Sequence, residues 1–502
     1  MMKKIYIFLL AFMPLWVMAQ DRIMVIADPH VLPQSVIAQD ANFDTYMQSQ
    51  RKMIDLSEPI WNALIDTALA YRPSLVLIPG DLTRDGETES HQMVANSLNQ
   101  LQEAGIRTLV IPGNHDLPGD NWESLYAGTY ENAIKDLESH SFAVEPIPGV
   151  TVIGIDGSDG NAGIGKLSET TLAFILAQAD SAVAKGNTII AMSHWQILEH
   201  FDQQGTLESS CRFKNADALR DSLMCHGVHL VLTGHFHING ITTYRDTTGL
   251  AMDSLVEITT GSPITYPCPY RWLTLNPSLG KIAVETDFLT AVDTIADLED
   301  YSREWMREHA TNMIPALALR AWNKIDNNWD KVEAKLALVG LDYLASYLKS
   351  RLPATDAERI EITQRYLGTA AVDMYLFHSE ANEFERPEMG REIADSVYAG
   401  MDGMMNECFG VFVEVAPIFK TMAKSMAEEP VESLVADITQ RGKTNEDLTD
   451  DLHPVLRIRE PWAEGIEKTE TKEASYRKVI RDGHVFIEHP DGSRYTILGE
   501  KQ

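Results

Sequence analysis

Residues 229–237 read His-Leu-Val-Leu-Thr-Gly-His-Phe-His, and this stretch decides the fold of the first half of the chain. The apolar run at 229–233 is typical of a buried strand, and Gly234-His235-Phe236-His237 follows it directly. With 31 glycines and 15 histidines in the chain, Gly-His-x-His is expected by chance only roughly 0.03 times. Because an open α/β sheet binds ligands at the carboxyl ends of its strands, these two histidines predict a functional site there.

Four more apolar runs end in polar side chains of the same kind. They lie at 23–27, 75–79, 108–112 and 188–193, and they lead into Asp28 and His30, Asp81, Asn114-His115-Asp116, and His194. A sixth run, at 152–156, lacks such an ending. Carboxylate oxygens and imidazole nitrogens together suit divalent Mn, Fe or Zn, and one carboxylate can bridge two ions. We therefore predict a metal or proton-transfer site that draws on five strand ends.

The order of the predicted elements indicates the fold class. Periodic helices are expected near 61–71, 91–104 and 169–184, and consecutive strands at 241–244, 255–260, 271–275 and 281–285. An α/β half followed by a run of strands predicts two packed sheets flanked by helices. We expect this domain at 20–290, a helical domain at 291–441, a linker at 442–475 and a β-hairpin tail at 476–502. Apolar residues at 332–348 recur at helical spacing, which predicts a helix-bundle core rather than a cofactor pocket.

Charge and the first residues bear on partners and location. The chain has 502 residues and a net charge of −31, which argues against a nucleic-acid polymer as partner. Lys3 and Lys4 precede an apolar run at 5–18 that ends in small residues, so we predict a signal peptide over 1–19 and export to the periplasm or the cell exterior. That run is shorter than the ~20 residues of a membrane-spanning helix, so no stable membrane anchor is expected. Cys211, Cys225, Cys268 and Cys408 allow three disulfide pairings, and sequence does not choose among them.

Taken in order, the motifs Asp-x-His, Gly-Asp, Gly-Asn-His-Asp, His and Gly-His-x-His resemble the signature of the calcineurin-like metallophosphoesterases. The resemblance covers about residues 23–287 and implies a four-layer αββα sandwich around a dinuclear metal centre. It implies that one ion is held by Asp28, His30 and His237, the other by Asn114, His194 and His235, and that Asp81 bridges them. It also implies that His115 acts on the phosphate as general acid or transition-state stabiliser, oriented by Asp116.

Departures from particular subfamilies narrow the resemblance. Arg84 stands where purple acid phosphatases have a tyrosine ligand, and residues 80–86 depart from the Gly-Asp-x-x-Asp-Arg-Gly of Ser/Thr protein phosphatases. The Gly80-Asp81-Leu82-Thr83 form looks more like the branch that contains class III cyclic-nucleotide phosphodiesterases. Arg84 could reach a phosphate, although a surface ion pair is the simpler interpretation, and Arg271 could face the crevice.

These patterns predict an exported metal-dependent phosphoesterase that hydrolyses mono- or diesters of a small phosphorylated substrate through a metal-activated water. The ions would be two divalent cations, Mn, Fe or Zn. The alternative is a binding or scaffolding module that uses the same fold and presents its helical domain to partners. Metal ligands alone do not separate monoesterases from diesterases, because both need the same two-ion site.

Overall fold

The structure is a computed structural model that describes 22–37, 41–48, 50–117, 119, 121–158, 163–201, 204, 209–245, 254–276, 280–338, 342–380, 386–409, 455–457, 477–481, 484–488 and 494–496. The expected signal peptide lies outside these residues, as does most of the expected linker. Among the described helices, none is both long enough and apolar enough to cross a membrane.

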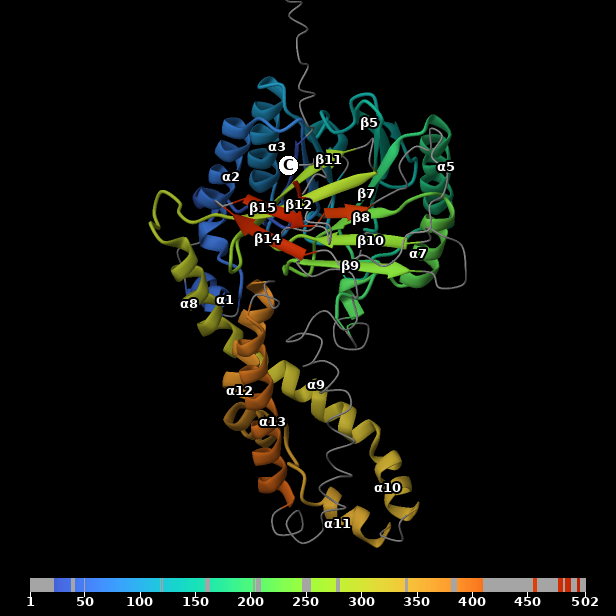
Figure 1. Cartoon of the computed structure of the whole chain (residues 1–502). Coiled ribbons are helices and arrows are strands. Elements are labelled where there is room, and N and C mark those ends of the chain that lie inside the picture. The colour runs from blue at the N-terminus through green and yellow to red at the C-terminus, as the bar shows by residue number, and fades with distance from the viewer. Residues whose placement is uncertain are drawn as a thin grey trace, which may run out of the picture.

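Two β-sheets form the centre of the first half of the chain (Figure 1). The first sheet has the order β13-β12-β11-β1-β2-β3, with bounds Val455–Arg457, Lys281–Phe288, Pro269–Asn276, Arg22–Val25, Leu75–Pro79 and Arg107–Ile111. The second sheet has the order β4-β5-β6-β7-β8-β10-β9, with bounds Ile134–Lys135, Phe142–Ile147, Val150–Ile155, Thr188–Ser193, Leu230–Thr233, Ser254–Thr259 and Gly240–Arg245.

The two sheets pack face to face and helices cover their outer faces. Leu77, Ile111, Ile190, Leu232 and Leu273 belong to one buried cluster that contains residues of both sheets. Outside the first sheet lie α2 (Ser57–Tyr71) and α3 (Thr88–Glu103), and outside the second lie α5 (Glu169–Lys185) and α7 (Ala216–Cys225). These four layers confirm the expected αββα sandwich.

Local sequence explains where the covering helices begin and end. In α5 the hydroxyl of Ser168 accepts a hydrogen bond from the Thr171 amide, which caps the first turn. The helix ends at Lys185, and the next residue, Gly186, has a φ of 75°, the left-handed conformation that is common at helix C-termini. In α2 the buried face includes Ile60, Trp61 and Leu64, which recur at helical spacing and pack on the first sheet.

Strand direction explains why the site forms where it does. In the first sheet β1, β2 and β3 are parallel, and in the second β6, β7 and β8 are parallel. The segments that follow β1, β2, β3, β7 and β8 therefore leave the sandwich at the carboxyl ends of their strands. Those segments carry the polar motifs described above.

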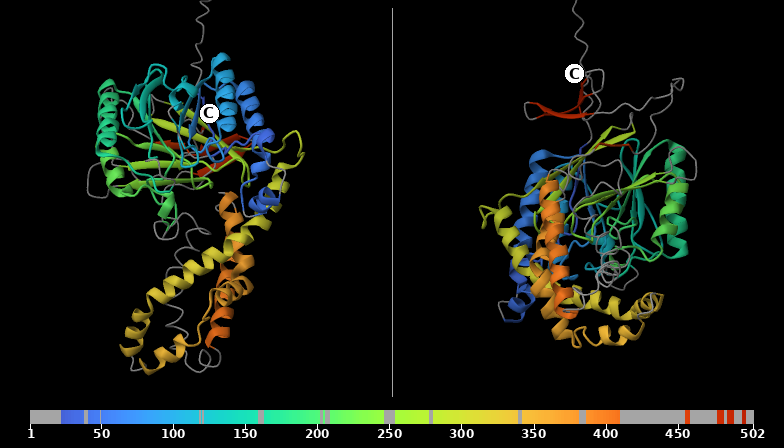
Figure 2. Two further views of the ribbon diagram at one scale, coloured as in Figure 1. Left: turned by 180° about the vertical axis from the view of Figure 1, so that it is seen from behind. Right: turned by 60° about the horizontal axis from the view of Figure 1, so that its bottom comes forward.

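A helical region projects from the sandwich (Figures 1 and 2). It consists of α8 (Leu298–Ala310), α9 (Ile314–Asn327), α10 (Trp329–Leu338), α11 (Ala345–Lys349), α12 (Asp356–Glu380) and α13 (Pro387–Phe409), with the short helix η5 (Thr311–Met313) between α8 and α9. Met306, Ile314, Val372 and Leu376 pack in one cluster with Tyr266 of the sandwich. The remaining described strands, β14 (Arg477–Arg481), β15 (His484–Glu488) and β16 (Arg494–Thr496), form a separate antiparallel sheet.

Several details differ from the sequence-based expectations. The strand β5 was not expected, because Glu145-Pro146 interrupts its apolar pattern, and the structure has a register shift between Val144 and Ile147. The segment expected to be a linker contributes β13, which pairs with β12 through the main chain. The apolar stripe expected at 332–348 is only partly core. Leu336 and Leu348 are buried, whereas Tyr343 and Tyr347 are exposed, and the helical spacing is interrupted because α10 ends at Leu338.

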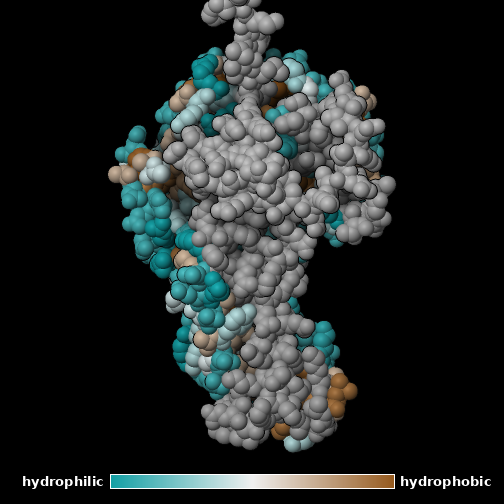
Figure 3. Space-filling view, viewed as in Figure 1, coloured by the Kyte–Doolittle hydropathy of each residue, from teal (hydrophilic) through white to brown (hydrophobic). Residues whose placement is uncertain are grey.

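Figure 3 shows hydrophobic surface at the end of the helical region that lies far from the sandwich, where α10 and α11 lie in Figure 1.

The four cysteines all fall within the described part of the chain, and no disulfide joins them there.

Candidate metal centre

The structure brings together all seven side chains that were expected to bind metal. They come from segments that follow strands of both sheets: Asp28 and His30 after β1, Asp81 after β2, Asn114 after β3, His194 after β7, and His235 and His237 after β8. His30 and His237, whose rings are in contact, are 207 residues apart along the chain. The site therefore exists only when the two sheets are packed together.

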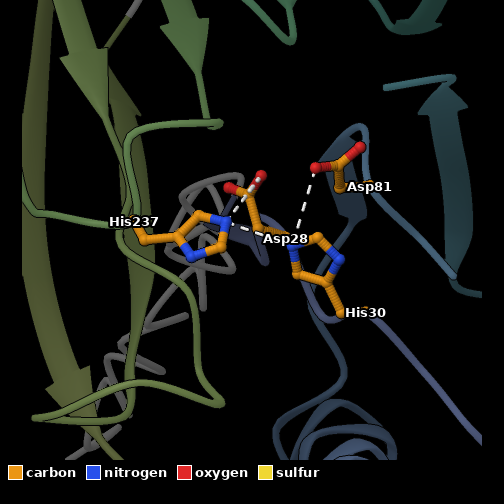
Figure 4. A group of neighbouring side chains, drawn as sticks. All are labelled: Asp28, His30, Asp81 and His237. Atoms are coloured by element: carbon orange, nitrogen blue, oxygen red, sulfur yellow. Dashed lines mark hydrogen bonds and ion pairs between the residues drawn. The ribbon is translucent and has the colours of Figure 1, made fainter. Parts of the chain in front are cut away.

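Asp28, His30, Asp81 and His237 form the first of two clusters (Figure 4). All four are buried, and their candidate ligand atoms lie within 4.8 Å of one another. The Nε2 atoms of His30 and His237 are 3.1 Å apart. Asp81 Oδ2 lies 3.5 Å from His30 Nε2, and Asp28 Oδ1 lies 3.7 Å from His237 Nε2. Two ring nitrogens and two carboxylates thus converge on one small volume.

The second cluster contains Asp81, His194 and His235, with Asn114 beside them. His194 Nε2 lies 3.3 Å from Asp81 Oδ2, 3.0 Å from Asn114 Oδ1 and 2.9 Å from His235 Nδ1. Asp81 is the one member that the two clusters share. A carboxylate between two clusters of nitrogen and oxygen donors is the arrangement that a pair of divalent ions requires.

The chemistry of these donors fits divalent cations. Buried carboxylates are costly unless cations compensate them, and this site has two, Asp28 and Asp81. The Nε2 atoms of His30 and His237 lie 3.1 Å apart, and His30 Nε2 also faces a carboxylate oxygen of Asp81. Hydrogen bonds between these side chains therefore do not account for all of the close contacts. Mixed imidazole and carboxylate sets suit Mn, Fe and Zn. We conclude that the residues present fit two such ions.

Burial and neighbouring charges shift the pKa values of several candidate ligands toward the protonation states in which they can bind metal. Burial lowers the pKa of both His30 and His237 well below the usual range, which keeps these rings neutral as metal ligands must be. Burial alone would raise the pKa of Asp81, but His194 and His30 hold it well below its usual range. Burial lowers the pKa of His194, but Asp81 and Asp28 outweigh that effect and raise it to about 9. The two carboxylates thus favour a positive charge at the position of His194.

The backbone of the site is in an uncommon conformation. Asp28, His30, Asp81, His235 and His237 all have positive φ, between 42° and 67°. For residues other than glycine this left-handed conformation costs roughly 1 kcal/mol or more each. The surrounding fold thus imposes the geometry of these five residues on the chain.

Two glycines allow the closest approaches in the site. A Cβ on Gly113 would lie 2.2 Å from Asp81 Oδ1, and one on Gly234 would lie 2.4 Å from Asp28 Oδ2. Real Cβ atoms essentially never come within 3.0 Å of another heavy atom, so both positions exclude a side chain. The two motifs therefore need glycine at these positions, because the carboxylates of Asp81 and Asp28 occupy the space that a Cβ would fill.

His115 lies beside the clusters, but its partner is not the expected one. Its ring meets that of His30 edge to face at 4.8 Å, and its Nδ1 lies 2.8 Å from Asp85 Oδ1. Asp116 instead accepts hydrogen bonds from the amides of Gly113 (2.8 Å) and Thr83 (2.9 Å). The residue that orients the His115 ring is therefore Asp85, and Asp116 ties together the two loops that follow β2 and β3. Neighbours in sequence at a turn point in different directions, which is why the expectation failed.

Neither arginine that was considered for substrate binding lines the pocket at the site. Arg84 forms ion pairs with Asp85 (3.0 Å) and Glu87 (2.9 Å), as the simpler interpretation had it. Arg271 is fully buried on β11, with its Nε 3.4 Å from Asn239 Oδ1. The pocket itself measures about 280 Å³ and is lined by Gln50, Arg51, Lys52, Asp81, His115, His235, His237 and Met313. Four of these residues belong to none of the sequence motifs: Gln50, Arg51, Lys52 and Met313.

A buried glutamate that was also missed supports the second cluster. On β10, Glu257 Oε2 accepts hydrogen bonds from the amides of Ile197 (2.9 Å) and Leu198 (2.8 Å). Its Oε1 lies 3.0 Å from His200 Nε2 and accepts a hydrogen bond from Thr233 Oγ1 at 3.1 Å. Glu257 thus fastens the loop after His194 to the end of β8. The signal in the sequence was a single charge inside the apolar run 255–259.

The family model described as "Calcineurin-like phosphoesterase" matches residues 21–239, the segment that holds every residue of both clusters. Residues 21–239 belong to the calcineurin-like phosphoesterase family. This confirms the resemblance drawn from the motifs, and the domain is that of a metal-dependent phosphoric ester hydrolase. The further resemblance to the cyclic-nucleotide phosphodiesterase branch stays a prediction.

Comparisons with other proteins add three solved structures similar to the phosphoesterase domain. A dimetal phosphatase from Danio rerio is 14% identical, with a TM-score of 0.42 over 53% of this chain and 95% of that one. Purple acid phosphatase PPD1 from yellow lupin, Lupinus luteus, is 12% identical, with a TM-score of 0.37 over 56% of this chain and 53% of that one. GAP50, described as the anchor in the inner membrane complex of Plasmodium, is 13% identical, with a TM-score of 0.29 over 53% of this chain and 84% of that one. No curated protein matches the chain in sequence.

Proposed function

We propose that this chain is an exported phosphoesterase that hydrolyses mono- or diesters of small phosphorylated molecules with the aid of two divalent ions. The observation that carries the proposal is the place of Asp81, whose carboxylate belongs to both donor clusters. All seven expected ligand side chains are present and close together, and a pocket opens beside them. An intact site next to a pocket supports catalysis over the alternative of a scaffold built on the same fold.

The chain's own residues have distinct tasks in this proposal. Asp28, His30 and His237 would hold one ion, Asn114, His194 and His235 the other, and Asp81 would bridge them. When bound, such a pair neutralises phosphate charge and activates a water molecule as the nucleophile. Because five of the seven side chains are buried and the fold fixes their positions, little reorganisation would accompany metal binding.

His115 would provide the proton for the departing alcohol. Its ring lines the pocket, and its Nδ1 is occupied by Asp85, so Nε2 is the nitrogen available to a substrate. A carboxylate at Nδ1 fixes the orientation of the ring. General acids of this kind typically contribute roughly 10²–10⁴ to the rate, and least when the leaving group is already acidic.

The test is metal-dependent hydrolysis by the full chain. Metal-free protein is supplied with Mn and assayed on nitrophenyl phosphate and bis-nitrophenyl phosphate, with metal content measured in parallel. Asp81→Asn should lower both metal content and turnover, whereas Asp66→Asn, which changes an exposed carboxylate on α2, should leave both unchanged. Full metal and full activity in Asp81→Asn, or no metal-dependent hydrolysis by the unaltered protein, would contradict the proposal.

Export is the part of the proposal that rests on sequence only, on the basic and apolar pattern of residues 1–19. The expected mature protein begins at Gln20. Amino-terminal sequencing of protein recovered from the periplasm or the medium checks this, and an exported chain that retains Met1 or Met2 would contradict it.

A further inference from the structure

Lys52 places a positive charge in the pocket beside the metal centre. It lies in the segment before η2 (Ile54–Leu56), and it is 8% exposed. The next residue, Met53, is fully buried, and its amide donates a hydrogen bond of 2.8 Å to the carbonyl of Ile264. The main chain at Lys52 is therefore held against the loop that follows β10, and the buried side chain lines the pocket.

The described surroundings of Lys52 hold no carboxylate at ion-pair distance that would neutralise its charge. Among the described residues, no carboxylate lies within ion-pair distance of its amino group, although Asp81, Asp85 and Asp28 are near enough to affect its pKa. Burial lowers that pKa, and these carboxylates counteract the effect. Lys52 lines the same pocket as Asp81 and His237 of the first cluster, and its charge contributes to the low pKa of His30 and of His237. A buried, unpaired ammonium beside two metal sites calls for an anion in the pocket.

We propose that Lys52 binds a terminal, unesterified phosphate oxygen of the substrate, and that it makes this enzyme a phosphomonoesterase. The inference rests on the proposed function, since it assumes that phosphate is bound at the metal centre. A monoester offers three free oxygens and two negative charges. A diester carries a carbon group on one of these oxygens, and where that group faced Lys52 the ammonium would stay buried and unpaired, which disfavours the diester.

The rest of the pocket limits the size of the alcohol. Its volume of about 280 Å³ is below the ~300–1,000 Å³ of sites for drug-sized ligands. Met313 of the helical region closes part of it, and Arg51 beside Lys52 is held over the ring of Tyr375 on α12 at 5.2 Å. The helical region thus completes the wall of the pocket that contains the positively charged side chains of Arg51 and Lys52. This wall suits a small phosphomonoester and not a nucleic-acid strand.

The test compares monoester and diester hydrolysis in variants of the full, metal-loaded chain. Lys52→Met should lower kcat/KM for nitrophenyl phosphate by roughly 10- to 100-fold, the value of a hydrogen bond to a charged group. The loss on bis-nitrophenyl phosphate should be at least tenfold smaller. Lys52→Arg should recover part of the monoester activity, and Lys214→Met, at an exposed lysine outside the pocket, serves as the control.

A binding measurement provides a readout that does not depend on turnover. Calorimetric affinity for inorganic phosphate should fall in Lys52→Met by a factor similar to that for the monoester, with metal content unchanged. Equal losses on both esters, unchanged phosphate affinity, or a preference of the unaltered enzyme for the diester would overturn the role of Lys52. Absence of any metal-dependent hydrolysis would instead overturn the proposed function, so the two failures are distinguishable.

Discussion

Gly113→Ala is a small change that should disable both metal positions at once. The new Cβ would lie 2.2 Å from Asp81 Oδ1 and 2.5 Å from the Asp81 amide nitrogen. An ordinary contact begins at 3.4 Å, so the carboxylate and the loop must separate by about 1.2 Å. Metal sites tolerate ligand displacements of only about 0.2 Å. Because Asp81 belongs to both clusters, neither ion should be retained at full occupancy.

Stability should change far less than metal content. Inserting a methyl group into a packed site typically costs about 1–3 kcal/mol, which a two-sheet domain of this size can tolerate. Metal per chain is measured by elemental analysis after dialysis against Mn, and folding by thermal unfolding of the metal-free protein. Two matched variants complete the experiment. Gly234→Ala should displace Asp28 and affect mainly the first cluster, and Gly163→Ala, where a Cβ meets nothing within 4 Å, should have no effect. A Gly113→Ala protein with two ions per chain and normal turnover would refute the reasoning.

Three further predictions follow from the site. Asp85→Ala should slow hydrolysis of an alkyl phosphate at least tenfold more than that of nitrophenyl phosphate, because His115 loses the carboxylate that orients its ring. Equal effects on kcat for the two substrates would contradict an orienting role of Asp85. Glu257→Ala should lower the free energy of unfolding by about 2–6 kcal/mol, because it leaves the buried amides of Ile197 and Leu198 without their acceptor. Denaturant titration would show no change if the network were unimportant. Affinity for Mn should rise about tenfold per pH unit until about pH 9 and then level off, because below that pH the metal must displace the proton on His194. Equilibrium dialysis measures this affinity, and a constant affinity from pH 6 to 9 would contradict the prediction.

The sequence was most informative where local pattern and function coincide. The strands before Asp28, Asp81 and His194 are apolar runs, and a motif follows each of them directly. Both the fold class and the positions of the candidate ligands could therefore be predicted from the sequence. In β5 the same approach failed, because Pro146 and a register shift break the alternation on which strand prediction depends.

Residues that act through space rather than through sequence could not be predicted. Asp85, Lys52 and Glu257 belong to no motif, and each reaches the site only because loops of the two sheets and the helical region meet there. The expectation for Asp116 shows the same limit, since adjacency to His115 says nothing of the direction in which a side chain points. Pairings of this kind are set by packing, which periodicity does not encode.

The left-handed backbone at five candidate ligand residues has a consequence for how this domain can be improved. Replacing His235 or His237 with glycine would relieve local strain and should favour the folded state, but would delete a donor. Selection for thermostability in the absence of metal would therefore favour proteins that are more stable but bind metal less well. Any engineering or evolutionary comparison in this domain should follow metal content alongside melting temperature, because the two are opposed at these positions.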